Sequence, residues 1–245
     1  VTGTFNSAFG YVALEENLGG GQNSAFGSAS LRFNTTGNKN SAFGYDSIVN
    51  NTTGSDNSAF GYNALDSNTV GNENSAFGNS ALQSLTATSS SNTALGYLAG
   101  GTQTRGSNNL FLGANTTVAS TTGSNQLSIG NLIYGTGLGT ADGFVGIGTS
   151  TPDTVLHVVG SRTYENVMML QNTSANGASG IGLFDNSGAY KGGMGYGNSG
   201  FAYSDQLAIV ANDEDISFVL GDTGYIAGTA AMTISNPSGN VGIGT

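Results

Sequence analysis

Hydrophobic and polar positions repeat along the first half of the chain with a period of 17 residues. The pentapeptide Asn-Ser-Ala-Phe-Gly begins at Asn6, Asn23, Asn40, Asn57 and Asn74. Weaker copies follow at Asn92, Asn109 and Leu127, and one step of 18 residues separates Gly78 from Gly96. A fixed short period sustained over eight copies predicts a stack of equivalent coils, in which each coil covers the apolar edge of the one before.

Within each copy the side chains alternate in size. Ser58, Phe60 and Tyr62 alternate with Ala59 and Gly61, which is the period of a strand with a large-residue face and a small-residue face. Glycine interrupts every copy and disfavours a helix. The polar half of the repeat is rich in Asn, Thr and Gly, residues typical of tight turns. Each repeat therefore predicts a strand, a turn, a shorter strand and a turn. We expect residues 1–130 to form a parallel β-roll, or β-solenoid, of eight repeats.

The Asn that opens each copy has two interpretations. Asn suits a turn, and its amide can also bond both the backbone and the Asn of the next coil, forming a ladder. A repetitive sheet needs some such device, because a slip of one coil places identical side chains in identical positions. The sequence leaves both interpretations open.

A 17-residue coil can enclose only one row of small or medium side chains. One apolar face, either the Phe and Tyr side or the Ala and Gly side, therefore stays exposed along the whole stack. A continuous stripe of this kind indicates an interaction surface. We expect its partner to be further copies of the same chain, related by rotational symmetry.

Beyond the repeats, residues 131–150 are rich in glycine and indicate a transition. Residues 151–240 contain short apolar runs separated by turn sequences, which predict a small antiparallel β-sandwich acting as a knob or spacer. The expected strands are 154–159, 166–171, 179–184, 206–210, 216–220 and 231–235. The string Val-Gly-Ile-Gly-Thr ends the chain at 241–245 and also occurs at 145–149. We therefore expect 241–245 to be the start of a further module and the chain to be part of a longer protein.

The composition narrows the possible chemistry. Only 8% of the residues are charged, the net charge is −10, there is no Cys, and His157 is the single histidine. Cysteine-dependent chemistry is excluded, and the lack of clustered Lys and Arg argues against nucleic acid and anionic membranes. No apolar run is long enough for membrane insertion. We expect no cofactor and no resident metal.

The motifs resemble those of known surface fibres. Asn-Ser-Ala-Phe-Gly is similar to the head repeats of trimeric autotransporter adhesins, which form parallel β-rolls in homotrimers, although the period of 17 is longer here. Residues 59–65, 125–136 and 145–152 resemble phage tail-fibre proteins and fibre-like bacterial adhesins still more closely. In such fibres Val-Gly-Ile-Gly-Thr often precedes a self-cleaving intramolecular chaperone domain. The resemblance implies a homotrimer on a virion tail or a bacterial surface.

One candidate ligand site lies in and just beyond the glycine-rich stretch 188–200. We expect residues 188–200 to be a loop. Aromatic rings with a few polar groups can stack on sugars, and the residues concerned are Tyr190, Lys191, Tyr196, Phe201, Tyr203 and Asp205. The alternative, which the sequence favours, is that these rings pack between subunits.

Two other groups of residues have a metal-binding interpretation. The run 213–215, with Asp185 and Asp222, offers oxygen ligands for Ca²⁺, but it lacks the spacing of a calcium loop, so a solvated turn is the better interpretation. His157 could meet its symmetry copies around an ion on a trimer axis. A histidine that bonds a neighbour on a strand face is the simpler interpretation.

The leading hypothesis is a homotrimeric, extracellular fibre segment for host attachment or adhesion, which presents a region that binds a cell-surface glycan or protein receptor. The alternative is that the 151–240 module is itself a lectin-like tip. A polysaccharide-degrading spike is a weaker possibility, because glycoside hydrolysis needs two acids about 5–10 Å apart in a groove. The acids of the repeats are scattered over turn-side positions, so we expect no enzyme: Glu15, Glu16, Asp46, Asp56, Asp66 and Glu73.

Overall fold

The computed structural model describes residues 3–86, 88–137, 143–160, 179–184, 190–197, 206–211, 216–220, 229–235 and 240–243. All regular structure in these ranges is β, and they contain no helix. The chain divides into two units, Val1–Val167 and Met168–Thr245. The all-β class predicted from the sequence is confirmed.

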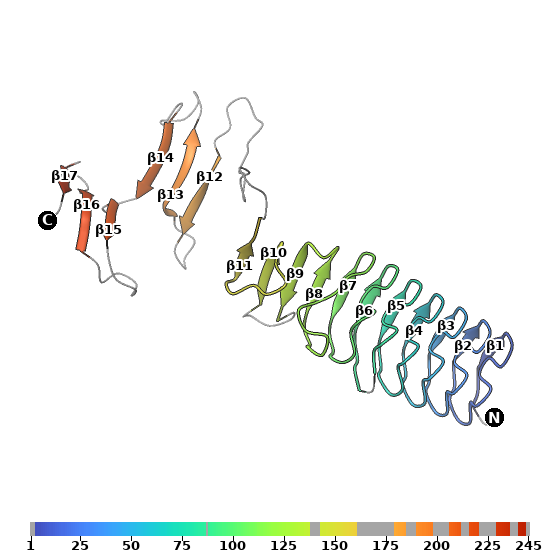
Figure 1. The fold of residues 1–245 in the computed structure, drawn as a ribbon. Coiled ribbons are helices and arrows are strands. Elements are labelled where there is room, and N and C mark those ends of the chain that lie inside the picture. Colours follow the sequence, from blue (N-terminus) through green and yellow to red (C-terminus); the bar gives the residue numbers. More distant parts are fainter. Residues whose placement is uncertain are drawn as a thin grey trace. The chain divides into compact units, whose positions relative to one another are not determined.

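The first unit is a β-solenoid built on one 11-stranded sheet whose strand order follows the chain (Figure 1). Strands β1 to β8 are parallel, and identical positions of successive repeats pair, as Ala42 pairs with Ala59. The 17-residue coil is thereby confirmed. The strands are β1 (Ser7–Phe9), β2 (Ser24–Phe26), β3 (Ser41–Phe43), β4 (Ser58–Phe60), β5 (Ser75–Phe77), β6 (Thr93–Leu95), β7 (Leu110–Leu112) and β8 (Leu127–Ile129).

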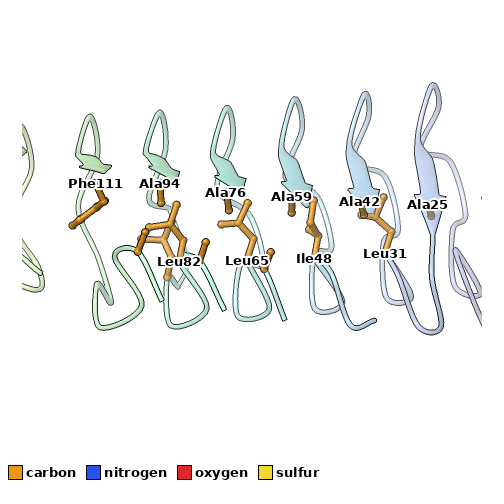
Figure 2. Close-up of a cluster of buried hydrophobic side chains, with 14 of the residues drawn as sticks. Ala25, Leu31, Ala42, Ile48, Ala59, Leu65, Ala76, Leu82, Ala94 and Phe111 are labelled. Atoms are coloured by element: carbon orange, nitrogen blue, oxygen red, sulfur yellow. The ribbon is translucent and has the colours of Figure 1, made fainter. Parts of the chain in front are cut away.

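The core is one narrow row of side chains inside the coils (Figure 2). The small residue of each strand, such as Ala59, points inward and meets a larger aliphatic residue from the far side of the coils, such as Ile48 or Leu65, and all three are fully buried. The Phe of each strand therefore points outward, because alternate side chains leave a strand on opposite faces. The sequence left open which apolar face is exposed, and it is the Phe and Tyr face.

The expected second strand of each repeat is not formed in the described coils. After the glycine, alternate residues adopt left-handed backbone, as Asp46 (φ 51°) and Ile48 (φ 49°) do in the third coil. This conformation is unfavourable for non-glycine residues. Hydrogen bonds between coils hold it in place, and the Ile48 N–H donates to the Ala64 carbonyl at 2.9 Å. The turn thus makes the inter-coil bonds that a second strand would have made.

Glycine closes each pentapeptide because the coils meet there backbone to backbone. Gly44 has φ of 140°, and a Cβ at this position would lie 2.6 Å from the carbonyl carbon of Gly61 in the next coil. Gly27 and Gly61 stand in the same relation to the coils that follow them. No side chain fits in this column.

One exchange of large for small residues maintains the core near the end of the regular stack. Phe111 occupies the position of the inward alanines, and Gly100 occupies the position of the inward leucines. A Cβ on Gly100 would lie 2.9 Å from the Phe111 ring. The ring fills the space that Gly100 leaves, which keeps the interior close-packed.

The region expected to be a transition carries the end of the first sheet. Strand β9 (Ile133–Thr136) runs antiparallel to β8, β10 (Phe144–Ile147) is antiparallel to β9, and β11 (Leu156–Val158) is parallel to β10. The strand expected to open the 151–240 module therefore belongs to the solenoid sheet. Pairing with β10 decides this, and no local sequence signal reports that pairing.

The second unit contains two three-stranded antiparallel sheets, with orders β12-β13-β14 and β15-β16-β17. Their strands are β12 (Ser179–Phe184), β13 (Tyr190–Gly197), β14 (Gln206–Ala211), β15 (Ile216–Leu220), β16 (Thr229–Ser235) and β17 (Asn240–Ile243). The loop expected within 188–200 is wrong over residues 190–197, because β13 is the central strand of its sheet. The expected strand at 166–171 lies outside the described residues. Packing of the two sheets as a sandwich stays a prediction.

Candidate functional site

The opening Asn residues form an unbroken ladder inside the solenoid. The side-chain oxygen of each accepts the backbone N–H of the equivalent residue one coil later, as Asn40 Oδ1 does from Asn57 N and Asn57 Oδ1 does from Asn74 N, both at 3.0 Å. The last of them, Asn109 Oδ1, accepts from Gln126 N at 2.9 Å. The Nδ2 of Asn57 donates to the Gly71 carbonyl at 2.8 Å. The ladder interpretation is confirmed. A slip that left an apolar side chain at one of these positions would orphan buried polar groups.

A second Asn ladder on the other side of the coil was not anticipated. Asn51 Nδ2 donates to Asn34 Oδ1 at 2.8 Å and to the Gly54 carbonyl at 2.9 Å, and Asn17 and Asn68 occupy equivalent positions. The same 17-residue spacing of these Asn residues was a visible signal. The ladder ends where Leu85 replaces Asn, and there the buried Asn68 Oδ1 has no partner.

The outward residues form a continuous aromatic and aliphatic stripe along the solenoid, which we call the aromatic stripe. Phe26, Phe43, Phe60 and Phe77 stack with ring centroids 4.7 to 4.9 Å apart and planes within 7° of parallel. This separation matches the ~4.8 Å spacing of paired strands. Most other members are more exposed: Phe9, Tyr11, Tyr45, Tyr62, Leu95, Tyr97, Leu112 and Ile129.

The apolar area that the stripe exposes is large compared with the apolar patches of ordinary monomeric proteins. Phe60 is 37% exposed and Tyr62 50% exposed in this chain. With about 200 Å² for a full aromatic side chain, the stripe leaves roughly 1,000 Å² of apolar surface in contact with water. The largest apolar patch of a typical monomer is about 300–600 Å². The faces of the central rings cover one another, so a ligand meets mainly ring edges.

Charged side chains of the solenoid lie away from its strands. Arg32 Nε lies 2.7 Å from Glu15 Oε2, and Lys39 Nζ lies 4.0 Å from Asp56 Oδ1. Burial raises the pKa of Asp66, and the neighbouring Asp46 carboxylate raises it further. Burial likewise raises the pKa of Asp46, although Arg32 opposes this shift. Neither carboxylate of this pair lines either of the two polar grooves on the solenoid turns that are described below.

The candidate sugar-binding residues fall in the second unit. Tyr190, Lys191 and Tyr196 lie in β13, where Tyr196 pairs with Ser179 of β12. The other three candidates, Phe201, Tyr203 and Asp205, lie outside the described residues. The strand places the first three along one extended backbone, and their role as a ligand site stays a prediction.

Of the candidate metal ligands, the described residues include His157. His157 lies in β11 with Nδ1 3.0 Å from Asp153 Oδ1, which agrees with a histidine that contacts a neighbour. Across the described ranges no three His, Cys, Asp or Glu side chains gather as a metal site. The acidic residues Asp185, Asp222 and 213–215 lie outside those ranges.

No protein family, curated protein or solved structure matches this chain. Nor does the described part of the chain contain a helix with the length and apolar character of a membrane span. Function must therefore be argued from the surfaces described above.

Proposed function

We propose that this chain is a structural segment of a homotrimeric extracellular fibre, with the solenoid as its shaft and the aromatic stripe as the contact between subunits. The observation that carries the proposal is the stripe itself. The Phe position of the stripe holds a large apolar side chain in all eight repeats, and the position two residues later holds Tyr in four of them, at Tyr11, Tyr45, Tyr62 and Tyr97. A surface that repeats its chemistry along its full length fits a partner with the same repeat, and another copy of this chain has it.

The area of the stripe can be compared with that of known interfaces. A stable interface buries about 800 Å² per partner, and in a trimer the stripe's roughly 1,000 Å² is divided between two neighbours, so flanking side chains contribute to each contact. Threefold rotation about an axis parallel to the stack lets each stripe contact two others along their whole length. Exposed ring edges of Phe60 and its neighbours can pack against ring faces or edges of a partner.

The two Asn ladders suit the solenoid to a mechanical role. The first ladder joins successive coils along the solenoid, the second joins the coils from Asn17 to Asn68, and the glycine column brings the backbones into contact. A rod held in this way resists bending and any slip of less than a whole coil. The resemblance of the repeats to fibre proteins supports placement on a virion tail or bacterial surface, where the fibre presents a receptor-binding region.

The test is the mass of the assembly in solution. Light scattering on the full 245-residue chain is expected to give three times the chain mass of 24.5 kDa. Phe60→Glu is expected to lower that mass, because it places three carboxylates at the buried contact. Thr53→Glu, at an exposed turn position, is the matched control and should leave the trimer intact. A monomeric wild-type chain would refute the proposal.

A further inference from the structure

A polar groove lies on the turns that follow β5, β6 and β7. None of the residues that line it belongs to the aromatic stripe. It has a volume of about 370 Å³. Its lining is almost entirely hydroxyl groups around one guanidinium: Thr86, Thr88, Arg105, Ser107, Thr122 and Ser124. We call it the Arg105 groove. It lies within the one repeat of 18 residues, between Gly78 and Gly96, and the two repeats that follow.

The charge around this groove differs from that of the rest of the chain. Residues 74–137 contain no Asp or Glu, although the whole chain has a net charge of −10. Arg105 is the only charged residue in that stretch. No carboxylate of the described residues lies within ion-pair distance of it, whereas Arg32 and Lys39 both have carboxylate partners. Arg105 is exposed, so its five N–H donors face solvent.

Two of the hydroxyl groups around Arg105 have hydrogens free to donate, whereas Thr86 Oγ1 already donates to the Thr104 carbonyl at 2.8 Å. Ser107 Oγ accepts the Ser90 N–H at 3.0 Å, and Ser124 Oγ accepts the Ser107 N–H at 2.9 Å. Each oxygen is engaged as an acceptor by the backbone, and its hydroxyl hydrogen can turn toward the groove. Thr88 is exposed at the rim. A ligand in the groove therefore meets one permanent positive charge and the hydroxyl donors of Ser107 and Ser124.

We propose that the Arg105 groove binds an acidic saccharide, with the guanidinium on a sugar carboxylate and the serine and threonine hydroxyls on the sugar hydroxyls. Arg presents a planar fork that matches a carboxylate with two parallel hydrogen bonds. Hydroxyl groups complement sugar hydroxyls because both donate and accept. The site lies on the solenoid and is distinct from the candidate sugar-binding residues of β13.

A second groove on the same solenoid provides an internal control. It has a volume of about 430 Å³ and includes Lys39, Asn38 and Ser55. Here the base faces its own carboxylate, because Asp56 also lines the groove and lies 4.0 Å from Lys39 Nζ. Both grooves are lined by polar turn residues. Lys39 has a carboxylate partner in its groove and Arg105 has none, so of the two grooves we expect the Arg105 groove to attract an anion.

The test is titration of the full chain, in its native assembly, with trigalacturonate, neutral maltotriose and inorganic sulfate, monitored by NMR and calorimetry at fixed ionic strength. Trigalacturonate is expected to bind saturably and at least tenfold more tightly than either other probe. Arg105→Gln is expected to weaken it at least tenfold, and Thr88→Val about threefold. Lys39→Gln should leave affinity unchanged.

Thermal unfolding should be the same for Arg105→Gln and the wild type, because the side chain is exposed and unpaired. Equal binding of sulfate would overturn the saccharide assignment, and an equal loss in Lys39→Gln would show a nonspecific charge effect. Absence of saturable trigalacturonate binding would overturn the site itself. None of these results depends on the number of subunits.

Discussion

Replacement of Asn57 by Ala tests the ladder that joins the coils. Asn57 is fully buried, and its Oδ1 is the acceptor of the Asn74 N–H. Its Nδ2 donates to the carbonyl of Gly71, which also accepts from Asn68 Nδ2 at 3.1 Å. Truncation therefore orphans one buried N–H and leaves the carbonyl with a partner. Truncation also removes the bonds from Asn74 Nδ2 to Asn57 Oδ1 at 3.2 Å and from Asn57 Nδ2 to Asn40 Oδ1 at 3.1 Å, whereas Asn74 Nδ2 keeps its bond to Ser89 O at 2.9 Å.

The expected loss of stability follows from these hydrogen bonds. A buried donor without a partner costs about 1–3 kcal/mol, and loss of an ordinary hydrogen bond costs about 1 kcal/mol. We therefore expect Asn57→Ala to lower the free energy of unfolding by about 2–4 kcal/mol. The matched control is Asn79→Ala, since Asn79 is exposed and bonds only the adjacent Ser80 hydroxyl. It should change stability by less than about 0.5 kcal/mol.

The assay is urea unfolding of the full chain followed by circular dichroism, at one protein concentration because assembly would couple to unfolding. Amide hydrogen exchange adds a local readout, and the Asn74 N–H should exchange faster in Asn57→Ala than in Asn79→Ala. Equal stability losses in the two variants would contradict the ladder account. So would unchanged exchange at Asn74.

Two further predictions concern the glycine column and the acidic pair. Gly44→Ala should lower the free energy of unfolding by more than about 3 kcal/mol in the same urea assay, because its Cβ would overlap the Gly61 backbone. The control is Gly130→Ala, where no atom lies within 4 Å of the added Cβ. It should lower the free energy of unfolding by only about 1 kcal/mol, because of the left-handed φ. Asp66→Asn should raise stability at pH 7 by up to about 0.5 kcal/mol. The raised pKa of Asp66 means that the folded state binds the proton more tightly than the unfolded state, so stability falls as pH rises through that pKa. The advantage of Asn should therefore vanish below the ordinary value of 3.8, and an advantage that grows toward low pH would contradict this reasoning.

The sequence predicted the features that repeat at a fixed spacing. The period located the strands, and alternation showed that Ala59 and Phe60 face opposite ways. The alternation from Ser58 to Tyr62 predicted a longer strand than Ser58–Phe60, which the structure forms. The local sequence did not show which face of the strand points into the coil. It depends on the width of the coil, where Ala59 needs a larger residue such as Leu65 across from it.

The features that sequence analysis missed depend on contacts between distant residues. Ile48 has a β-branched side chain, which argues against a left-handed φ, yet bonds to the neighbouring coil impose that conformation. Strand β13 is rich in glycine, which indicated a loop, but it pairs on both sides with β12 and β14. The Arg105 groove required the stacking of three turns before its residues came together.

The most direct test of the central claim is a distance between identical residues of different copies. The chain has no cysteine, so Tyr62→Cys and Thr53→Cys each carry one spin label. If the aromatic stripe lies at the trimer axis, electron–electron resonance should give a short intermolecular distance for the label at Tyr62 and a clearly longer one for the label at Thr53. A longer distance at Tyr62 than at Thr53, or no intermolecular coupling at either, would contradict the account.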